Sequence, residues 1–281
     1  MRIPQTDVAH AGDISLFNAG GTNLICDFNN VSLTLSEKQE DGSCPGRDGE
    51  DPQGVKRSGK ISIELLGNRS GGEAYERTSH IDVTSVSIGA HDYIEVLKSL
   101  EFKGEFTKFM KAGVGAWWEK PQNRRKKFSG SVVLEEGDGV AAPFLIAASS
   151  NAYGTRNTTL SIVVGGQIYA LPIRMGDVQT GRGRGDEGGE ITIPWTGRDP
   201  GSGAYPTTAP SGTATLFARA WSAWKTPISW AFTSKTSAGW AATGLAVFDS
   251  FGFKIEDGAF VPTSYEFSLY GKPDFSATSG T

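Results

Sequence analysis

Residues 124–135 of the chain are Arg-Arg-Lys-Lys-Phe-Ser-Gly-Ser-Val-Val-Leu-Glu, and this stretch decides the fold. After the four basic residues, Phe128, Val132 and Leu134 share one phase of a two-residue repeat, with Gly130 in phase between them. Successive side chains of a β-strand point to opposite faces of its sheet. The stretch therefore predicts a strand with one apolar face and one polar face.

The same two-residue period recurs along the whole chain. It is found in residues 31–35, 61–65, 81–83, 160–164, 191–195, 251–255 and 265–269. Asp-Gly and Gly-Gly turn signals separate these runs, and 37 of the 281 residues are glycine, near twice the usual ~7%. Short strands with glycine-rich turns predict an all-β protein, mainly an antiparallel β-sandwich or barrel. One or two short helices are also expected, over residues 139–150, with Asp138 as a possible N-cap, and over residues 216–224.

Two long segments interrupt the alternation and suggest how the chain is divided. Residues 37–56 carry six acidic side chains and predict a loop, and residues 197–212, rich in Gly and Pro, form the best candidate boundary. We expect three units: 1–80, a β unit with the long acidic loop; 81–200, a β-sandwich; and 201–281, a Trp-rich β segment that completes the sandwich or forms a second unit. The pattern S-G-x-Φ-x-Φ-E occurs at residues 58–64 and 129–135, which indicates either a duplicated sheet unit or a chance similarity of two strands.

Composition excludes several classes of protein. The formal net charge of −4 disfavours a dedicated nucleic-acid binder, which is usually basic. No apolar run approaches the ~20 residues that span a bilayer. The N-terminal residues lack an apolar signal core, so we expect no export by a signal peptide, and Cys26 and Cys44 are expected to be reduced thiols.

Motifs of catalysis are missing from the sequence. His10, His80 and His91 do not stand at metal-ligand spacing, and there is no HExxH, CxxC, P-loop or GxSxG motif. Two dispersed carboxylates, as in a glycosidase, would leave no such signature. We expect no enzymatic activity, no cofactor and no metal.

Tryptophan and charge are both clustered along the chain. Trp221, Trp224, Trp230 and Trp240 are four of the seven tryptophans; they fit either burial, in a core or a subunit interface, or a groove that stacks on sugar rings. A basic patch at Lys120 and residues 124–127 contrasts with acidic stretches elsewhere. Patches of opposite charge favour self-association. The alternative is an ordinary solvated surface of the same composition.

Taken together, these features resemble the bacteriophage tail tube (major tail) protein family. The resembling segments are the strand at residues 82–88, a long Lys/Gly/aromatic loop, the stretch 124–134, the short Ala-rich segment 141–150, the strands 160–164 and 167–173, and the closing segment 264–273. They cover about two-thirds of the chain, most strongly from residue 82 to residue 173.

The resemblance implies a structural virion protein of the tail, assembled in the host cytoplasm. Subunits of this family form a ring, expected to be a hexamer, and stacked rings form a hollow tube through which DNA passes without specific binding. The implied partners are further copies of the chain and the terminator, tape measure, and baseplate or tip proteins, with no membrane. By position, residues 102–127 are the loop that reaches the next ring. Its anchors are Trp117 and Trp118, and the interface candidates are Arg124, Arg125, Lys126 and Lys127.

The alternative function is that of a glycan-binding β-sandwich, such as a receptor-binding or decoration module of a virion. That function would require the Trp side chains of residues 221–240 to line an open groove.

Overall fold

Alternating apolar and polar residues form long antiparallel strands through most of the chain. The computed structural model describes residues 6–9, 14–19, 22–23, 28–41, 52–67, 83–111, 116–137, 140–150, 154–164, 167–181, 189–198, 216–222, 224–234, 240–256 and 261–277. The fold is all-β, as predicted, and its sheet is open.

The strands of the first half are β1 (Thr6–Ala9), β2 (Ile14–Ala19), β3 (Thr22–Asn23), β4 (Phe28–Asp41), β5 (Pro52–Gly67), β6 (Val83–Ile88), β7 (His91–Asp92), β8 (Leu97–Lys111) and β9 (Lys120–Glu136). Those of the second half are β10 (Asn157–Val164), β11 (Gln167–Met175), β12 (Gln179–Gly181), β13 (Gly189–Gly197), β14 (Ile228–Ser234), β15 (Trp240–Glu256), β16 (Val261–Leu269) and β17 (Asp274–Ala277). The helices are α1 (Ala142–Ser149) and α2 (Leu216–Ser222), with a 3-10 turn at Ile94–Val96.

One antiparallel ladder joins most of these strands. Its hydrogen-bonded order is β1–β4–β5–β16–β15–β8–β9–β13–β11–β10–β6–β7. Strands β14, β2 and β3 extend from the N-terminal half of β15. Pairing of β5 with β16 and of β8 with β15 links all three units expected from the sequence; their boundaries stay a prediction.

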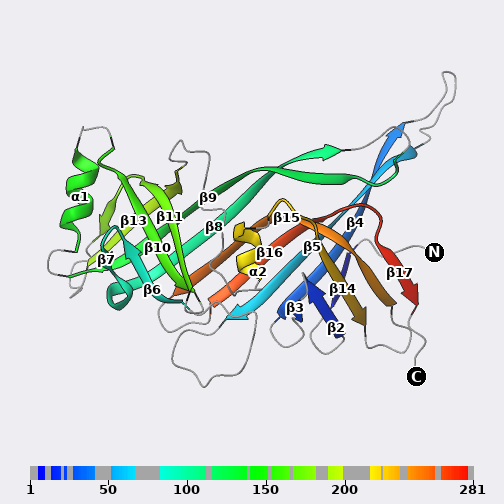
Figure 1. Ribbon diagram of the computed structural model, residues 1–281, viewed down its shortest axis with the longest axis horizontal. Coiled ribbons are helices and arrows are strands. Elements are labelled where there is room, and N and C mark those ends of the chain that lie inside the picture. The colour runs from blue at the N-terminus through cyan, green and yellow to red at the C-terminus, as the bar shows by residue number, and fades with distance from the viewer. Residues whose placement is uncertain are drawn as a thin grey trace.

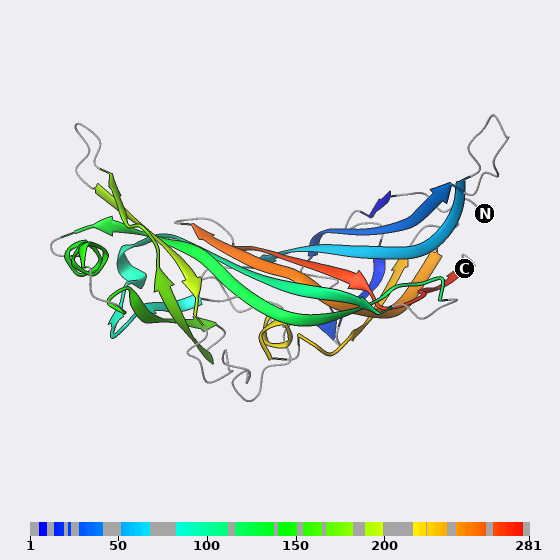
Figure 2. The same ribbon diagram turned by 90° about the horizontal axis from the view of Figure 1, so that it is seen from above.

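The molecule is elongated and curved. Figure 1 shows α1, β6, β7, β10, β11 and β13 at one end, and β2 to β5, β14 and β17 at the other. The long strands β8, β9, β15 and β16 connect the two ends, and Figure 2 shows that they bend along their length.

Both predicted helices are present. Helix α2 lies within the predicted residues 216–224, and α1 lies within 139–150. The predicted N-cap of α1 is wrong, because Ala141 and not Asp138 occupies that position, without a side-chain cap. Pro143 in the first turn explains this start, since the early helix positions need no backbone N–H.

The predicted acidic loop is shorter than expected. Strand β4 continues to Asp41 and β5 begins at Pro52, so only residues 42–51 of the predicted segment 37–56 lie outside the described residues. Within the hairpin, Nε of Arg57 donates to Oε1 of Glu37 at 3.1 Å. Opposite charges on paired positions favour strand pairing over a loop. Of the predicted boundary 197–212, residues 199–212 also lie outside the described part of the chain.

A cluster of aromatic rings forms the centre of the core. The alternation of β8, β9 and β15 places Phe102, Phe128 and Phe251 on one buried face. Helix α2 covers this face, and its Trp221 ring stacks on Phe128 with centroids 5.0 Å apart. The Phe217 ring meets Phe251 edge-on at 5.6 Å. Large aromatic side chains supply much of the apolar burial in a core, so this cluster holds the long strands together.

The tryptophan cluster belongs largely to this core. Trp221, Trp224 and Trp230 are buried, which confirms the burial interpretation for these three. Trp240 is half-buried and its ring stacks on Phe232 with centroids 4.8 Å apart.

Two glycines on the apolar faces of strands make room for neighbouring groups. Gly59 and Gly130 occupy the same place in the repeated pattern S-G-x-Φ-x-Φ-E. A Cβ at Gly59 would contact the side chain of Leu269 at 2.5 Å. At Gly130 it would overlap the backbone carbonyl of Glu101 and lie 2.8 Å from the ring of Trp195. Close approach of strands and rings therefore requires glycine at these positions.

Candidate assembly interface

The β8–β9 hairpin extends beyond its pairing with the flanking strands β15 and β13, and its outer part forms an arm. Strand β15 pairs with β8 only at residues 99–105, and β13 pairs with β9 only at residues 129–136. We call residues 107–111 and 116–125 the arm. Figure 1 shows the hairpin running along the molecule towards the end formed by β4 and β5.

The arm is attached to its own subunit at its outer end. The backbone N–H of Arg57 in β5 donates to the carbonyl of Trp117 at 2.7 Å, and the N–H of Glu119 donates to the carbonyl of Arg57 at 3.0 Å. The N–H of Gly271 donates to the carbonyl of Glu119 at 3.0 Å. Arg57 lies beyond the residues of β5 that pair with β16, and Gly271 follows the end of β16 at Leu269, so the arm is held at the end of β16.

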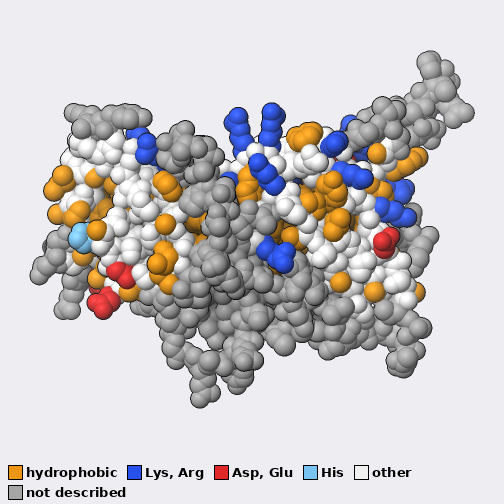
Figure 3. Space-filling model, viewed as in Figure 1, with side chains coloured by type: hydrophobic (Ala, Val, Ile, Leu, Met, Phe, Trp, Pro, Cys, Tyr) orange, Lys and Arg blue, Asp and Glu red, His pale blue; other side chains and the backbone are white. Residues whose placement is uncertain are grey.

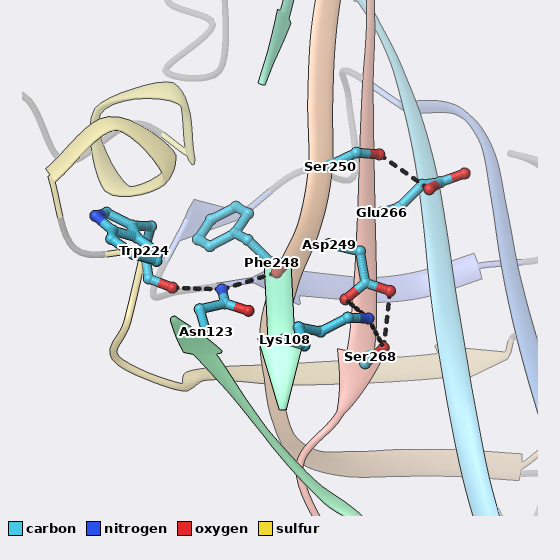
Figure 4. Close-up of polar contacts among 8 residues, drawn as sticks. All are labelled: Lys108, Asn123, Trp224, Phe248, Asp249, Ser250, Glu266 and Ser268. Atoms are coloured by element: carbon cyan, nitrogen blue, oxygen red, sulfur yellow. Dashed lines mark hydrogen bonds and ion pairs between the residues drawn. The ribbon is translucent and has the colours of Figure 1, made fainter. Parts of the chain in front are cut away.

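Under the arm, the side chain of Asn123 takes the place of a strand neighbour. Strand β15 changes partner from β8 at residues 250–256 to β14 at residues 241–246. In the gap between these pairings, the carbonyl of Phe248 accepts from Nδ2 of Asn123 at 2.8 Å. The same Nδ2 donates to the carbonyl of Trp224 at 2.7 Å, as Figure 4 shows. One buried amide thus ties the arm to β15 and to the segment after α2.

A second polar contact under the arm joins Lys108, Asp249 and Ser268 (Figure 4). Asp249 lies at a bulge of β15, where the register with β16 shifts. Nζ of Lys108 forms an ion pair with Asp249 and donates to Oγ of Ser268 at 2.7 Å, and Ser268 donates to Oδ2 of Asp249 at 2.7 Å. These three residues connect β8, β15 and β16 in a closed network.

The chemistry of this network is structural. A serine beside a lysine can be a nucleophile if the lysine accepts its proton. Here Lys108 donates to both of its partners and the hydroxyl of Ser268 donates to Asp249. These hydrogen bonds hold β8, β15 and β16 together.

Breaking this ion pair is expected to destabilise the fold. Asp249→Ala should lower the free energy of unfolding by about 2 kcal/mol, because it leaves a largely buried ammonium with one hydrogen-bond partner fewer. The control is Glu105→Ala, which removes the ion pair with Lys103, whose side chains are 48% and 53% exposed. Denaturant unfolding should show less than about 1 kcal/mol for the control. Equal losses in the two variants would contradict the structural role of Asp249.

Lys126 does not belong to the surface patch that the basic run predicts. It shares the phase of Phe128 and is buried, and its Nζ donates to the carbonyl of Trp221 at 3.0 Å. The ammonium lies 5.4 Å from the centroid of the Phe128 ring and 5.9 Å from that of Trp224. Burial, with a smaller contribution from the charge of Lys225, lowers the pKa of Lys126 to about 8. Lys126 is buried because every second residue of this strand faces the core.

The other predicted basic residues do lie on the surface. Arg124, Arg125 and Lys127 are exposed on β9. Lys111 at the end of β8 and Lys120 at the start of β9 are also exposed. Figure 3 shows Lys and Arg side chains gathered over the middle and right of the molecule, with hydrophobic side chains among them.

The two predicted anchors are placed differently. Trp117 is 60% exposed, whereas Trp118 is half-buried and packs against the core of its own subunit. Phe109 and Met110 are each 47% exposed. Sequence reasoning missed Phe109, although there was a signal: it stands in the polar phase of β8, in line with Glu105 and Thr107.

At the opposite end, α1 presents apolar side chains to solvent. Phe144 packs on Tyr93 with ring centroids 5.4 Å apart, while Leu145 and Ile146 are 40% and 69% exposed. Asp92 and Glu95 flank Tyr93 and are exposed, as is Glu135 near the end of β9. In Figure 3 acidic side chains lie at the lower left, on the α1 half of the molecule. Helix α1 is apolar except for Ser149, so apolar side chains occupy positions that a surface helix usually gives to polar ones.

The polar face of the sheet forms a groove of about 460 Å³ across β5, β16, β15 and β8. Its lining includes Ser62, Glu64, Glu101, Lys103, Lys254 and Ser264. Acidic and basic side chains are mixed there, so the groove favours neither sign of charge. Within the described part of the chain, no group of three His, Cys, Asp or Glu residues could hold a metal ion.

No helix among the described residues is long and apolar enough to cross a membrane. Comparison with protein-family models, with curated proteins and with solved structures finds nothing that matches this chain.

Proposed function

We propose that the chain is a structural virion protein that self-assembles into stacked rings, forming the hollow phage tail tube through which DNA is ejected. The observation that carries the proposal is the difference between the two ends of an elongated subunit. One end bears a basic arm with exposed aromatic side chains, and the other bears an apolar helix among acidic residues. Contacts between unlike surfaces repeat from subunit to subunit and generate rings or filaments.

The order of elements supports the same proposal. Strand β6, the β8–β9 hairpin, α1, β10 and β11 follow one another in the order that the resemblance to tail tube proteins implies. The open sheet also supports it, because strands from neighbouring subunits can cover sheet edges that would otherwise promote uncontrolled aggregation.

The mixed charge of the groove is compatible with a channel for DNA. Phosphates bind tightly to surfaces rich in Lys and Arg. A face on which Glu64 and Glu101 offset Lys103 and Lys254 would attract DNA only weakly, and the polymer would pass along it.

The glycan-binding alternative has less support. It depends on tryptophan rings in an open groove, and Trp221, Trp224 and Trp230 are buried. Buried rings offer no face on which a sugar can stack.

The test is electron microscopy of the purified protein together with its mass by light scattering. We expect rings or hollow tubes whose mass increases with protein concentration. A monomer at every soluble concentration, also after addition of a kosmotropic salt that strengthens apolar contacts, would overturn the proposal.

The two neighbouring tryptophans separate assembly from folding. Trp117→Ala should shorten or abolish tubes and leave the melting temperature within a few degrees of wild type, because its side chain is 60% exposed. Trp118→Ala should instead lower the melting temperature, by an amount corresponding to about 2 kcal/mol, because Trp118 packs on the core. Tube lengths from micrographs and thermal unfolding measure the two effects. Unchanged tubes in Trp117→Ala would contradict a role of Trp117 in assembly.

A further inference from the structure

We infer that the arm of one subunit docks on the α1 end of a second copy, in a head-to-tail contact. The inference rests on the proposed self-assembly and names the two surfaces that meet. The arm patch consists of Phe109, Lys111, Trp117, Lys120, Arg124 and Arg125. The helix patch consists of Asp92, Glu95, Glu135, Leu145 and Ile146.

The arm patch combines apolar contact area with positive charge. Phe109 and Trp117 are 47% and 60% exposed, although large apolar side chains are usually buried. The charged members of the patch are all basic. Aromatic side chains and Arg are among the residues enriched in the cores of protein interfaces.

The helix patch has the complementary composition. Leu145 and Ile146 project from α1 at 40% and 69% exposure, and the charged members of the patch are all acidic. Asp92 is held in place, because its carboxylate accepts from Oγ of Ser85 at 2.7 Å and from the backbone N–H of Ile94 at 3.1 Å. The orientation of the Asp92 carboxylate is therefore already fixed in the free subunit.

Charge decides which surfaces pair. Two arm patches would repel each other, as would two helix patches, whereas an arm patch and a helix patch attract. The patches lie in opposite halves of the elongated subunit (Figure 1). After two copies meet, one arm patch and one helix patch are still exposed. Further copies can therefore add to both ends, and the contact propagates instead of closing as a symmetric dimer.

The experiment uses two variants, each of which loses one patch without gaining a new charge. The arm variant carries Trp117→Ser, Arg124→Ser and Arg125→Ser. The helix variant carries Leu145→Ser, Ile146→Ser and Glu95→Ser. All six side chains are exposed, so thermal unfolding of both variants should match wild type. Ile168→Ser, at a 63% exposed apolar residue outside both patches, is the matched control.

Sedimentation and light scattering give the result. Each variant alone should stay monomeric at concentrations at which wild type and Ile168→Ser assemble, raising the concentration needed for assembly at least about tenfold. A 1:1 mixture should form dimers and nothing larger, because only the intact arm of one variant and the intact helix patch of the other can meet.

Different outcomes would contradict the arm-to-helix contact and the self-assembly proposal. If wild type assembles and either variant assembles like it, or the mixture stays monomeric, the arm-to-helix contact is wrong and the proposed function stands. If wild type itself stays monomeric under all conditions, the self-assembly proposal fails as well.

Discussion

Gly130→Ala is expected to lower the free energy of unfolding by about 3 kcal/mol or more. A methyl group at this position would overlap the carbonyl of Glu101 on the paired strand and press on the ring of Trp195 at 2.8 Å. The carbonyl belongs to the backbone of β8, so it cannot move away as a flexible side chain would. Overpacking of a core usually costs about 1–3 kcal/mol, and displacement of a paired strand adds to that.

The matched control is Gly181→Ala in β12, where a Cβ would meet no atom within 4 Å. Denaturant unfolding of both variants measures the difference, and the control should change stability by less than about 1 kcal/mol. Equal stability of Gly130→Ala and wild type would contradict the close approach of β8 and β9 at Glu101.

Raising the pH from about 8 to 10.5 is expected to stabilise the wild-type protein relative to Lys126→Met. The folded protein releases the Lys126 proton near pH 8, whereas the unfolded chain keeps it up to the ordinary pKa of 10.5. Between these values the unfolded state binds more protons, so the free energy of unfolding rises with pH. A depression of this size corresponds to about 3 kcal/mol over the whole range.

Below pH 8 both states hold the proton and the contribution is constant, as a penalty for the buried ammonium. Lys126→Met removes the titrating group and keeps an apolar chain of similar length, so it should be the more stable protein at pH 7. Lys127→Met, on the exposed face of the same strand, is the control and should follow wild type at each pH. Parallel stability curves for wild type and Lys126→Met between pH 7 and 10.5 would contradict the lowered pKa.

The polar contacts under the arm affect assembly as well as stability. Lys108, Asn123 and Lys126 all use polar atoms to hold the arm or α2 in place from below. The exposed side chains in the opposite phase of the hairpin occupy the other side of the arm: Phe109, Lys111, Lys120 and Arg125. A subunit that must present a patch to a neighbour gains from a rigid support, since less conformational freedom is lost when the contact forms.

Much of β9 was predictable from sequence. Phe128, Val132 and Leu134 are fully buried, as their shared phase requires. The same phase includes Lys126, so alternation contained the signal that this lysine faces the core, and the run of four basic residues concealed it. Trp117 and Trp118 are neighbours in sequence, and only their position on the arm decides which of them is exposed.

The network under the arm could not be predicted in the same way. Asp249 and Ser268 are far from Lys108 in the chain, and the bulge that turns Asp249 towards it is a property of the β15–β16 pairing. The sequence of β15 has no local signal for its change of partner from β8 to β14.

Sequence by itself determined that this protein is built from strands, which residues of most strands are buried, and where two short helices lie. These properties depend on the covalent geometry of a few neighbouring residues, which imposes a two-residue or 3.6-residue period on side-chain direction. Tertiary structure alone decided that the outer end of the arm is held by Arg57 of β5 and by Gly271, that Asn123 fills the gap beside Phe248, and which residues of the arm and of α1 are exposed. Pairing between distant strands depends on the sum of many weak contacts over the whole chain, and no short stretch of sequence contains that sum.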